Sequence, residues 1–181
     1  MARYVALLRG INVGGKNIIK MVALKACFEK AGFKDVATFI QSGNVVFTGS
    51  GSAAALTKRI EAMLGNAFDY QASVVLRSDK QLHDIVQLAP KGFGSQPAQY
   101  RYDVLFLKEP LTASEAMKSV KAKPGVDTAH AGKGVLYFSR LISKAAQSHL
   151  PRLIALPLYQ SLTIRNWNTT TRLLDLLAAD P

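Results

Sequence analysis

Residues 9–17 of the chain have the sequence RGINVGGKN. An apolar run at residues 4–8 precedes them and predicts a first strand, and an amphipathic run from Met21 predicts a first helix. The glycines and asparagines of the stretch allow sharp backbone turns that leave amide groups exposed. Because Arg9 and Lys16 add positive charge, the stretch is typical of a loop that contacts an anion.

The composition favours a globular protein of the cytoplasm. Of its 181 residues 49% are hydrophobic, which is enough to fill the core of one domain or of two small ones. No apolar window is long enough to cross a membrane, and Arg3 and Arg9 interrupt the first apolar run, so we expect neither a membrane partner nor export. Cys27 is the single cysteine, which excludes an internal disulfide and fits a reducing cytoplasm.

The charge is strongly basic, with a formal net value of +11. Residues 118–172 hold nine lysines and arginines against one acid, Asp127. A field of this sign attracts nucleic acid, nucleotides or acidic surfaces. The alternative is a solvated basic face that only aids solubility, because the charges are spread along the chain.

Hydrophobic periodicity predicts strands and helices in a repeated order. The predicted strands lie at residues 4–8, 35–40, 45–48, 72–76, 101–107, 126–129 and 134–138. The predicted helices contain residues 21–31, 56–64, 82–86, 116–120, 141–149 and 173–177. Ser78 with Gln81 and Thr112 with Glu115 form capping-box patterns, and Asn166 or Asn168 is expected to cap the last helix.

This order indicates the fold class. The first half of the chain follows the β-α-β-β-α-β pattern, and the second half follows it as far as its second helix. We therefore predict an α+β fold of two ferredoxin-like (split βαβ) subdomains with mostly antiparallel sheets. The predicted boundaries are an N-terminal subdomain at 1–90, a linker rich in proline and glycine at 91–99, and a C-terminal subdomain with a helical tail at 100–181.

The basic loop also matches most of a phosphate-binding P-loop, through Gly10, Gly15 and Lys16. Asn17 stands where that motif needs a serine or threonine hydroxyl for magnesium, which argues against a nucleoside triphosphatase. A loop that binds phosphate, sulfate or a nucleic-acid backbone without hydrolysis is more consistent with the residues. A purely structural connection between strand and helix remains the alternative.

No residues form a recognisable catalytic or metal-binding pattern. The serines, histidines and acids show no triad spacing, and the three histidines with Cys27 make no zinc motif, so we predict no metal and no cofactor and leave the catalytic residues unassigned. Two further polar stretches are notable, the turn at residues 41–44 and the segment at 163–169 that contains the single tryptophan, Trp167. Each either lines a binding cleft or serves only as a turn or helix cap.

Three segments together resemble a known family. ALLRGINVGGKN at 6–17, IQSGNVVF at 40–47 and RNWNT at 165–169 resemble the bacterial domain-of-unknown-function family 1697 (DUF1697). The resemblance implies a compact α+β protein of two ferredoxin-like subdomains, and it implies no activity. It marks as motif positions Arg9, Asn12, Gly14, Gly15, Lys16, Gln41, Ser42, Asn44, Arg165, Asn166 and Trp167.

Our leading hypothesis is a non-enzymatic protein that binds an anionic ligand, either nucleic acid or a nucleotide or other phosphate-bearing small molecule. One alternative is an enzyme that acts on a small phosphorylated or acidic metabolite, with Arg9, Lys16 and Arg165 as a clamp. Another is a structural or interaction module without a small ligand. We expect the three motif stretches to converge on one anion site formed by Arg9, Asn12, Gly14, Gly15, Lys16, Gln41, Ser42, Asn44, Arg165 and Asn166.

Overall fold

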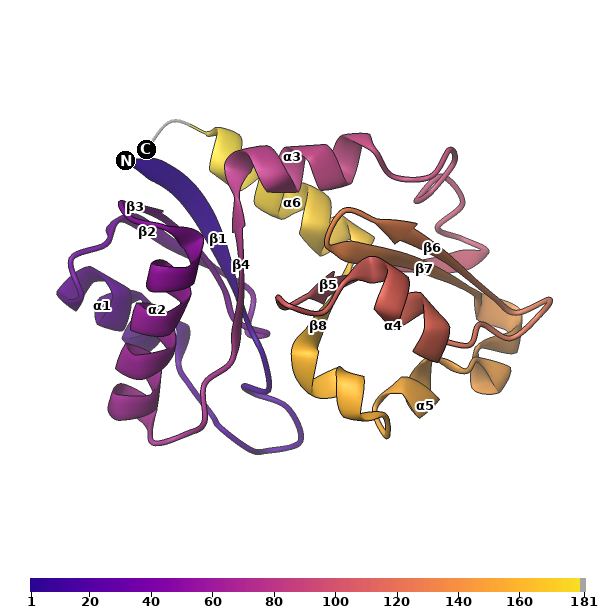
Figure 1. Cartoon of the computed structure of the whole chain (residues 1–181), viewed down its shortest axis with the longest axis horizontal. Coiled ribbons are helices and arrows are strands. Elements are labelled where there is room, and N and C mark those ends of the chain that lie inside the picture. The colour runs from indigo at the N-terminus through magenta and orange to yellow at the C-terminus, as the bar shows by residue number, and fades with distance from the viewer. Residues whose placement is uncertain (180–181) are drawn as a thin grey trace. The chain divides into compact units, whose positions relative to one another are not determined.

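The computed structural model describes residues 1–179 and contains two four-stranded antiparallel sheets with helices between their strands (Figure 1). The predicted α+β fold of two ferredoxin-like units is therefore confirmed. The strands are β1 (Ala2–Leu8), β2 (Lys34–Phe39), β3 (Asn44–Gly49), β4 (Val74–Ser78), β5 (Tyr100–Leu107), β6 (Asp127–Gly132), β7 (Val135–Leu141) and β8 (Leu162–Asn166). The α-helices are α1 (Met21–Lys30), α2 (Ala53–Phe68), α3 (Asp79–Gln87), α4 (Ala113–Ser119), α5 (Leu150–Leu153) and α6 (Trp167–Ala178).

The first sheet has the strand order β2-β3-β1-β4, and helices α1 and α2 cover one of its faces (Figure 1). The 16-residue helix α2 supplies Leu56, Ile60 and Leu64 to the core beneath it, because residues at this spacing share one face of a helix. Phe47 of β3 lies at the centre of this core, with ring centroids 5.5 Å from Phe28 and 4.7 Å from Phe33.

Strand β2 lies at the edge of the first sheet and carries a β-bulge. Its register against β3 shifts between Lys34 and Ala37, and Asp35 there has a positive φ of 50°. A bulge of this kind inserts an unpaired residue and increases the local twist.

The second sheet has the equivalent order β6-β7-β5-β8, but its helical cover is shorter. Helix α4 packs on it through Ala116, and Val120, the residue after the helix, joins the same core. The connection from β7 to β8 contains two 3-10 helices, η1 (Ile142–Gln147) and η2 (Pro157–Ser161), with only the four-residue helix α5 between them. This connection stands at the place in the fold that the long helix α2 holds in the first half of the chain.

Contacts divide the chain into two units, which we call unit 1 (residues 1–83 with the segment from Arg172 onward) and unit 2 (residues 84–171). The predicted boundaries of 1–90, 91–99 and 100–181 do not coincide with this division. Residues 84–99 belong to unit 2, where Tyr137 Oη donates a hydrogen bond of 2.6 Å to Ile85 O. The end of α6 belongs to unit 1, where Arg3 Nη2 donates to Leu176 O at 3.1 Å. The assignment of residues 91–99 as a linker stays a prediction.

Local signals in the sequence were accurate at the helix starts. Ser78 N donates to Gln81 Oε1 at 2.9 Å while Gln81 N donates to Ser78 Oγ at 3.2 Å, which is the predicted capping box. The same reciprocal pair joins Thr112 and Glu115. Asn166 Oδ1 accepts from Thr169 N at 2.7 Å and so caps α6, as one of the two predicted alternatives.

Two elements differ from the sequence prediction. Of residues 141–149, predicted to be helical, Leu141 is the last residue of β7 and residues 142–147 form the 3-10 helix η1. None of the residues of η1 is buried, so no apolar stripe holds an α-helix there. The hydrophobic pattern also gave no strand at β8, although Leu162, Thr163 and Ile164 have the β-branched and apolar character that favours one.

Candidate ligand-binding site

The predicted anion loop between β1 and α1 is a small closed hairpin. Asn12 N donates to Asn17 O at 3.1 Å and Lys16 N donates to Val13 O at 3.1 Å, so that Gly14 and Gly15 form the tip. Both glycines have positive φ, 60° and 73°, which is the geometry of a two-residue hairpin turn and explains why glycine stands there. The tip is exposed to solvent.

The side chain of Asn12 holds this loop in place. Its Nδ2 donates to Ile19 O at 3.0 Å and to Gln41 O at 2.8 Å, and its Oδ1 accepts from Ile19 N at 2.8 Å. Asn12 therefore ties the loop to its own end and to the turn between β2 and β3. These three hydrogen bonds use the side-chain amide of Asn12, a residue that was predicted from the sequence to bind the ligand.

The turn between β2 and β3 is likewise built on its own polar groups. Asn44 is 0% exposed and donates to Phe39 O at 2.8 Å and to Ser42 Oγ at 3.1 Å. Gly43 has no room for a side chain, because a Cβ there would lie 2.6 Å from Cδ1 of Ile11. The loop and the turn are thus packed together, and among the predicted site residues in them Gly14, Gly15, Lys16 and Gln41 remain exposed.

The third predicted stretch lies in unit 2. Arg165 is 6% exposed and donates to Thr163 Oγ1 at 2.8 Å and to Ile164 O at 2.9 Å, and burial lowers its pKa to about 10. Asn166 is exposed at the end of β8, and Trp167 follows it, half-buried, at the start of α6. Two of the three motif stretches therefore meet within unit 1, and the convergence of the third with them stays a prediction.

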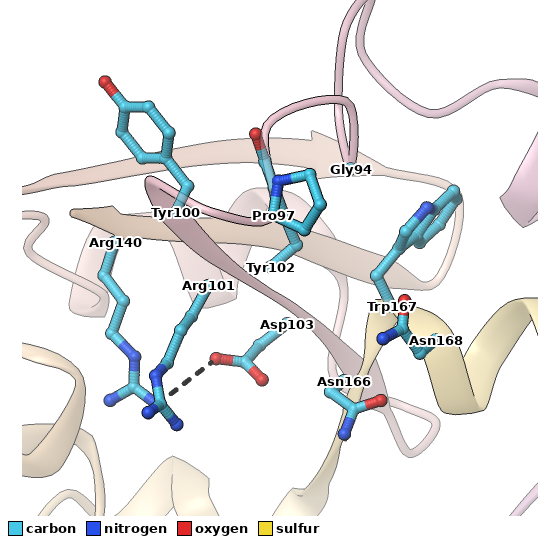
Figure 2. A pocket seen from close by; sticks show the side chains of 10 residues that line it. All are labelled: Gly94, Pro97, Tyr100, Arg101, Tyr102, Asp103, Arg140, Asn166, Trp167 and Asn168. Atoms are coloured by element: carbon cyan, nitrogen blue, oxygen red, sulfur yellow. Dashed lines mark ion pairs between the residues drawn. The ribbon is translucent and has the colours of Figure 1, made fainter. Parts of the chain in front are cut away.

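Around Asn166 and Trp167 unit 2 contains an open cavity of about 280 Å³, which we call the polar pocket (Figure 2). It is lined by Gly94, Pro97, Tyr100, Arg101, Tyr102, Asp103, Arg140, Asn166, Trp167 and Asn168. The pocket forms where β8 ends, because β8 pairs with β5 only from Asp103 onward and leaves the first residues of β5 without a partner on that side.

Three charged side chains from two strands meet in the polar pocket. Arg101 of β5 is directly opposite Arg140 of β7 in the sheet register, and Figure 2 shows the two side chains extending together beside Asp103. Arg140 Nη2 lies 3.7 Å from Asp103 Oδ2. Arg140 forms an ion pair with Asp103, and the positive charge of Arg101 also acts on this carboxylate. The three side chains together carry a net positive charge when Asp103 is ionised.

Asp103 is the least solvated of the three. It is 8% exposed, and no group in the part of the chain that the structure describes makes a hydrogen bond to its Oδ2. Burial raises the pKa of Asp103 above its usual range, and the positive charges of Arg140 and Arg101 offset only part of that rise. Nε of Arg140 is also buried without a hydrogen-bond partner among residues 1–179.

An aromatic cluster forms another wall of the pocket. The ring of Phe93 packs at 5.1 Å and nearly perpendicular to Trp167, and at 4.9 Å from Tyr102. Gly94 lies so close to the indole that a Cβ at this position would overlap Nε1 of Trp167. Gly94 also has a φ of +86°, so glycine is needed here for both conformation and space.

Arg101, Asp103 and Arg140 are not among the site residues predicted from the sequence. The alternation of Arg101 and Asp103 along one strand places both on the same face, and this is a signal that the sequence contains. The approach of Arg140 follows from the register of β7 against β5, which the sequence does not specify.

Within residues 1–179, no group of three or more histidine, cysteine, aspartate or glutamate side chains is arranged to hold a metal ion. Over the same residues, none of the helices has the length and apolar character required to span a bilayer.

Comparison with known proteins identifies the family. The chain belongs to DUF1697, described as a protein family of unknown function, whose model matches residues 1–137. The resemblance inferred from the three motifs is therefore confirmed. No curated protein matches the chain significantly.

Among solved structures, the chain is similar to a conserved bacterial protein from Streptococcus pneumoniae, with 27% sequence identity and a TM-score of 0.86. The match covers 97% of this chain and 98% of the streptococcal chain, so the likeness extends over both units.

Proposed function

We propose that the protein binds a nucleotide unit, either free or within a single-stranded nucleic acid, in the polar pocket of unit 2. The observation that carries this proposal is the placement of Arg101 directly opposite Arg140, with one carboxylate, Asp103, in an ion pair with Arg140. Like charges at directly opposed positions destabilise a sheet. A phosphate between the two guanidinium groups would relieve this repulsion and accept their hydrogen bonds.

The remaining lining suits the rest of a nucleotide. Trp167, which also lines the pocket, has an aromatic ring on which a base can stack, an interaction that tolerates any base. Asn168 adds a side-chain amide that can donate to and accept from a base edge or a sugar. Asn166 adds an amide nitrogen that can donate, while its oxygen caps α6. This combination of arginine, aromatic and amide groups supports binding of a single-stranded or free nucleotide rather than of a closed duplex.

The loop of unit 1 supports a second anion contact. Gly14 and Gly15 expose their backbone at the tip, and within residues 1–179 their N–H groups have no acceptor. Lys16 is exposed next to them. Exposed amides beside a lysine suit a phosphate oxygen, so Lys16 is the second residue whose removal should weaken binding of a nucleic acid.

An enzyme acting on a small phosphorylated or acidic metabolite is the alternative function. Its specific support is Asp103, because a buried carboxyl group with a raised pKa beside two arginines suits proton transfer. It predicts turnover that Asp103→Asn abolishes, whereas simple binding predicts that this variant keeps or gains affinity for an anion.

The test uses Trp167, the single tryptophan of the chain, as reporter. Titration with oligothymidylate at low salt should quench its fluorescence, because a base stacks on or near the indole. Arg101→Gln changes an exposed side chain and should weaken binding about threefold to tenfold, the loss expected for one phosphate contact. Affinity should fall steeply with added salt as counterions are released.

Lys144→Gln is the matched control, since it removes an exposed charge of unit 2 that does not line the pocket. Thymidine monophosphate in place of the oligomer distinguishes a free nucleotide from a strand. The proposal fails if no quenching occurs at low salt, or if Lys144→Gln weakens binding as much as Arg101→Gln.

A further inference from the structure

A second cavity of unit 2, which we call the apolar pocket, has a different character. Its volume is about 460 Å³, within the range of small-molecule sites. Its walls come from the end of α4 and the following residues, from α5, and from Phe138 of β7. Val120, Phe138, Leu150, Leu153 and Leu156 give it an apolar interior.

The two walls of the apolar pocket are joined by polar contacts at one end. The carboxylate of Asp127 accepts from Lys123 N at 3.0 Å and from His149 N at 2.8 Å, which links the segment after α4 to the residue before α5. His149 Nδ1 also lies 3.2 Å from Lys121 O. These contacts tie the two walls of the pocket together.

The charges around the pocket have one sign. Lys121 and Arg152 both line it and are exposed, and the set of lining residues that the structure describes contains no carboxylate. The acid of the neighbourhood, Asp127, lies outside the lining and is held by the two amides. An apolar interior beneath two cations complements a ligand with a hydrocarbon body and an anionic head.

We infer that the apolar pocket binds an amphipathic monocarboxylate, with its hydrocarbon chain on Phe138 and Leu153 and its carboxylate at Lys121 and Arg152. This site is separate from the polar pocket, with which it shares no lining residue. The inference therefore does not depend on nucleotide binding.

The test is calorimetric titration of the full chain with hexanoate, octanoate and decanoate below their micelle concentrations. Affinity should rise about threefold to fourfold for each added methylene that becomes buried. Decanoate should bind more tightly than decanol, and decyltrimethylammonium should bind least, because the rim is cationic.

Variants locate the site. Lys121→Gln with Arg152→Gln should weaken decanoate about threefold to tenfold and leave the folded circular dichroism spectrum unchanged, since both side chains are exposed. Ser119→Phe should block the pocket from its rim, and Lys118→Gln should have no effect, because Ser119 lines the cavity and Lys118 does not. Arg101→Gln, which alters the polar pocket, should leave decanoate affinity unchanged.

Three results would overturn the inference. One is the absence of binding at millimolar decanoate. Another is equal binding of the anionic and cationic amphiphiles, which would indicate unspecific adsorption. The third is a dimer that Ser119→Phe converts to a monomer, which would show that a second copy of the chain occupies the pocket.

Discussion

The two units have the same strand order but cover their sheets differently, and the apolar pocket follows from this difference. In unit 1 two full helices cover the sheet, and Phe28, Phe33 and Phe47 form a continuous aromatic core. In unit 2 the second helix of the pattern is replaced by two 3-10 helices and a four-residue α-helix. A shorter cover leaves the apolar pocket above Phe138. The same architecture can therefore carry two full helices over one sheet and a shorter cover with a cavity over the other.

The largest expected effect comes from removing a core phenylalanine from each unit. Phe47→Ala removes a ring surrounded by other rings and should lower the free energy of unfolding of unit 1 by about 4–5 kcal/mol. Phe138→Ala should cost unit 2 less, about 3 kcal/mol, because Phe138 is among the residues that line the apolar pocket. Urea unfolding followed by Trp167 fluorescence reports unit 2, and far-UV circular dichroism reports the whole chain. Equal losses would contradict the looser cover of unit 2.

A smaller effect on stability is expected when alanine replaces either of two glycines with positive φ. Gly94→Ala should destabilise unit 2 by about 2–3 kcal/mol, because its Cβ would overlap Trp167 in addition to the conformational strain. Gly14→Ala meets nothing within 4 Å and should cost unit 1 only about 1 kcal/mol of strain. Thermal melting gives both values, and the emission maximum of Trp167 should shift in the Gly94 variant alone. An unchanged emission maximum would argue against the Gly94–Trp167 contact.

Within the loop of unit 1 we expect one residue to stabilise the fold and another to bind the ligand. Asn12→Ala loses three hydrogen bonds and should destabilise unit 1 by about 1–3 kcal/mol. Lys16→Ala changes an exposed side chain and should stay within about 0.5 kcal/mol. Chemical denaturation measures both, and binding of oligothymidylate should decrease in the Lys16 variant. If Asn12→Ala is neutral, the loop is held by its backbone alone.

The smallest effect is a pH dependence confined to unit 2. Burial raises the pKa of Asp103, so as pH falls through that raised value the carboxyl group gains a proton and the pocket loses a negative charge. Affinity for oligothymidylate should then rise a few-fold toward low pH, and neither thymine nor the phosphodiester titrates in that range. In Asp103→Asn the affinity should be high and independent of pH. A pH response that persists in this variant would assign the titration to another group.

Sequence reasoning succeeded where the signal is local. A helix cap such as Ser78 with Gln81 can be recognised from two residues three positions apart. The order of strands and helices can be recognised from the period of the hydrophobic residues. Together these two signals were enough to predict the fold class. It missed β8 because Arg165 and Asn166 gave that segment a polar character, although Arg165 is buried in the fold.

The candidate site was harder to predict for two physical reasons. Arg101 and Arg140 meet through strand register, which depends on packing across the whole sheet and has no counterpart in residue spacing. Asn12 shows the second reason. An asparagine in a glycine-rich loop can bind a ligand or brace the backbone, and its amide does the latter here through Ile19 and Gln41.

The bulge in β2 has a consequence for the behaviour of the protein at high concentration. An edge strand presents unpaired backbone groups on which another chain can add a strand and start an aggregate. The register shift between Lys34 and Ala37 twists this edge, and the charges of Lys34 and Asp35 lie exposed on it. The edge is thereby a poor template for a neighbouring molecule, which favours a protein that stays dispersed when it is abundant.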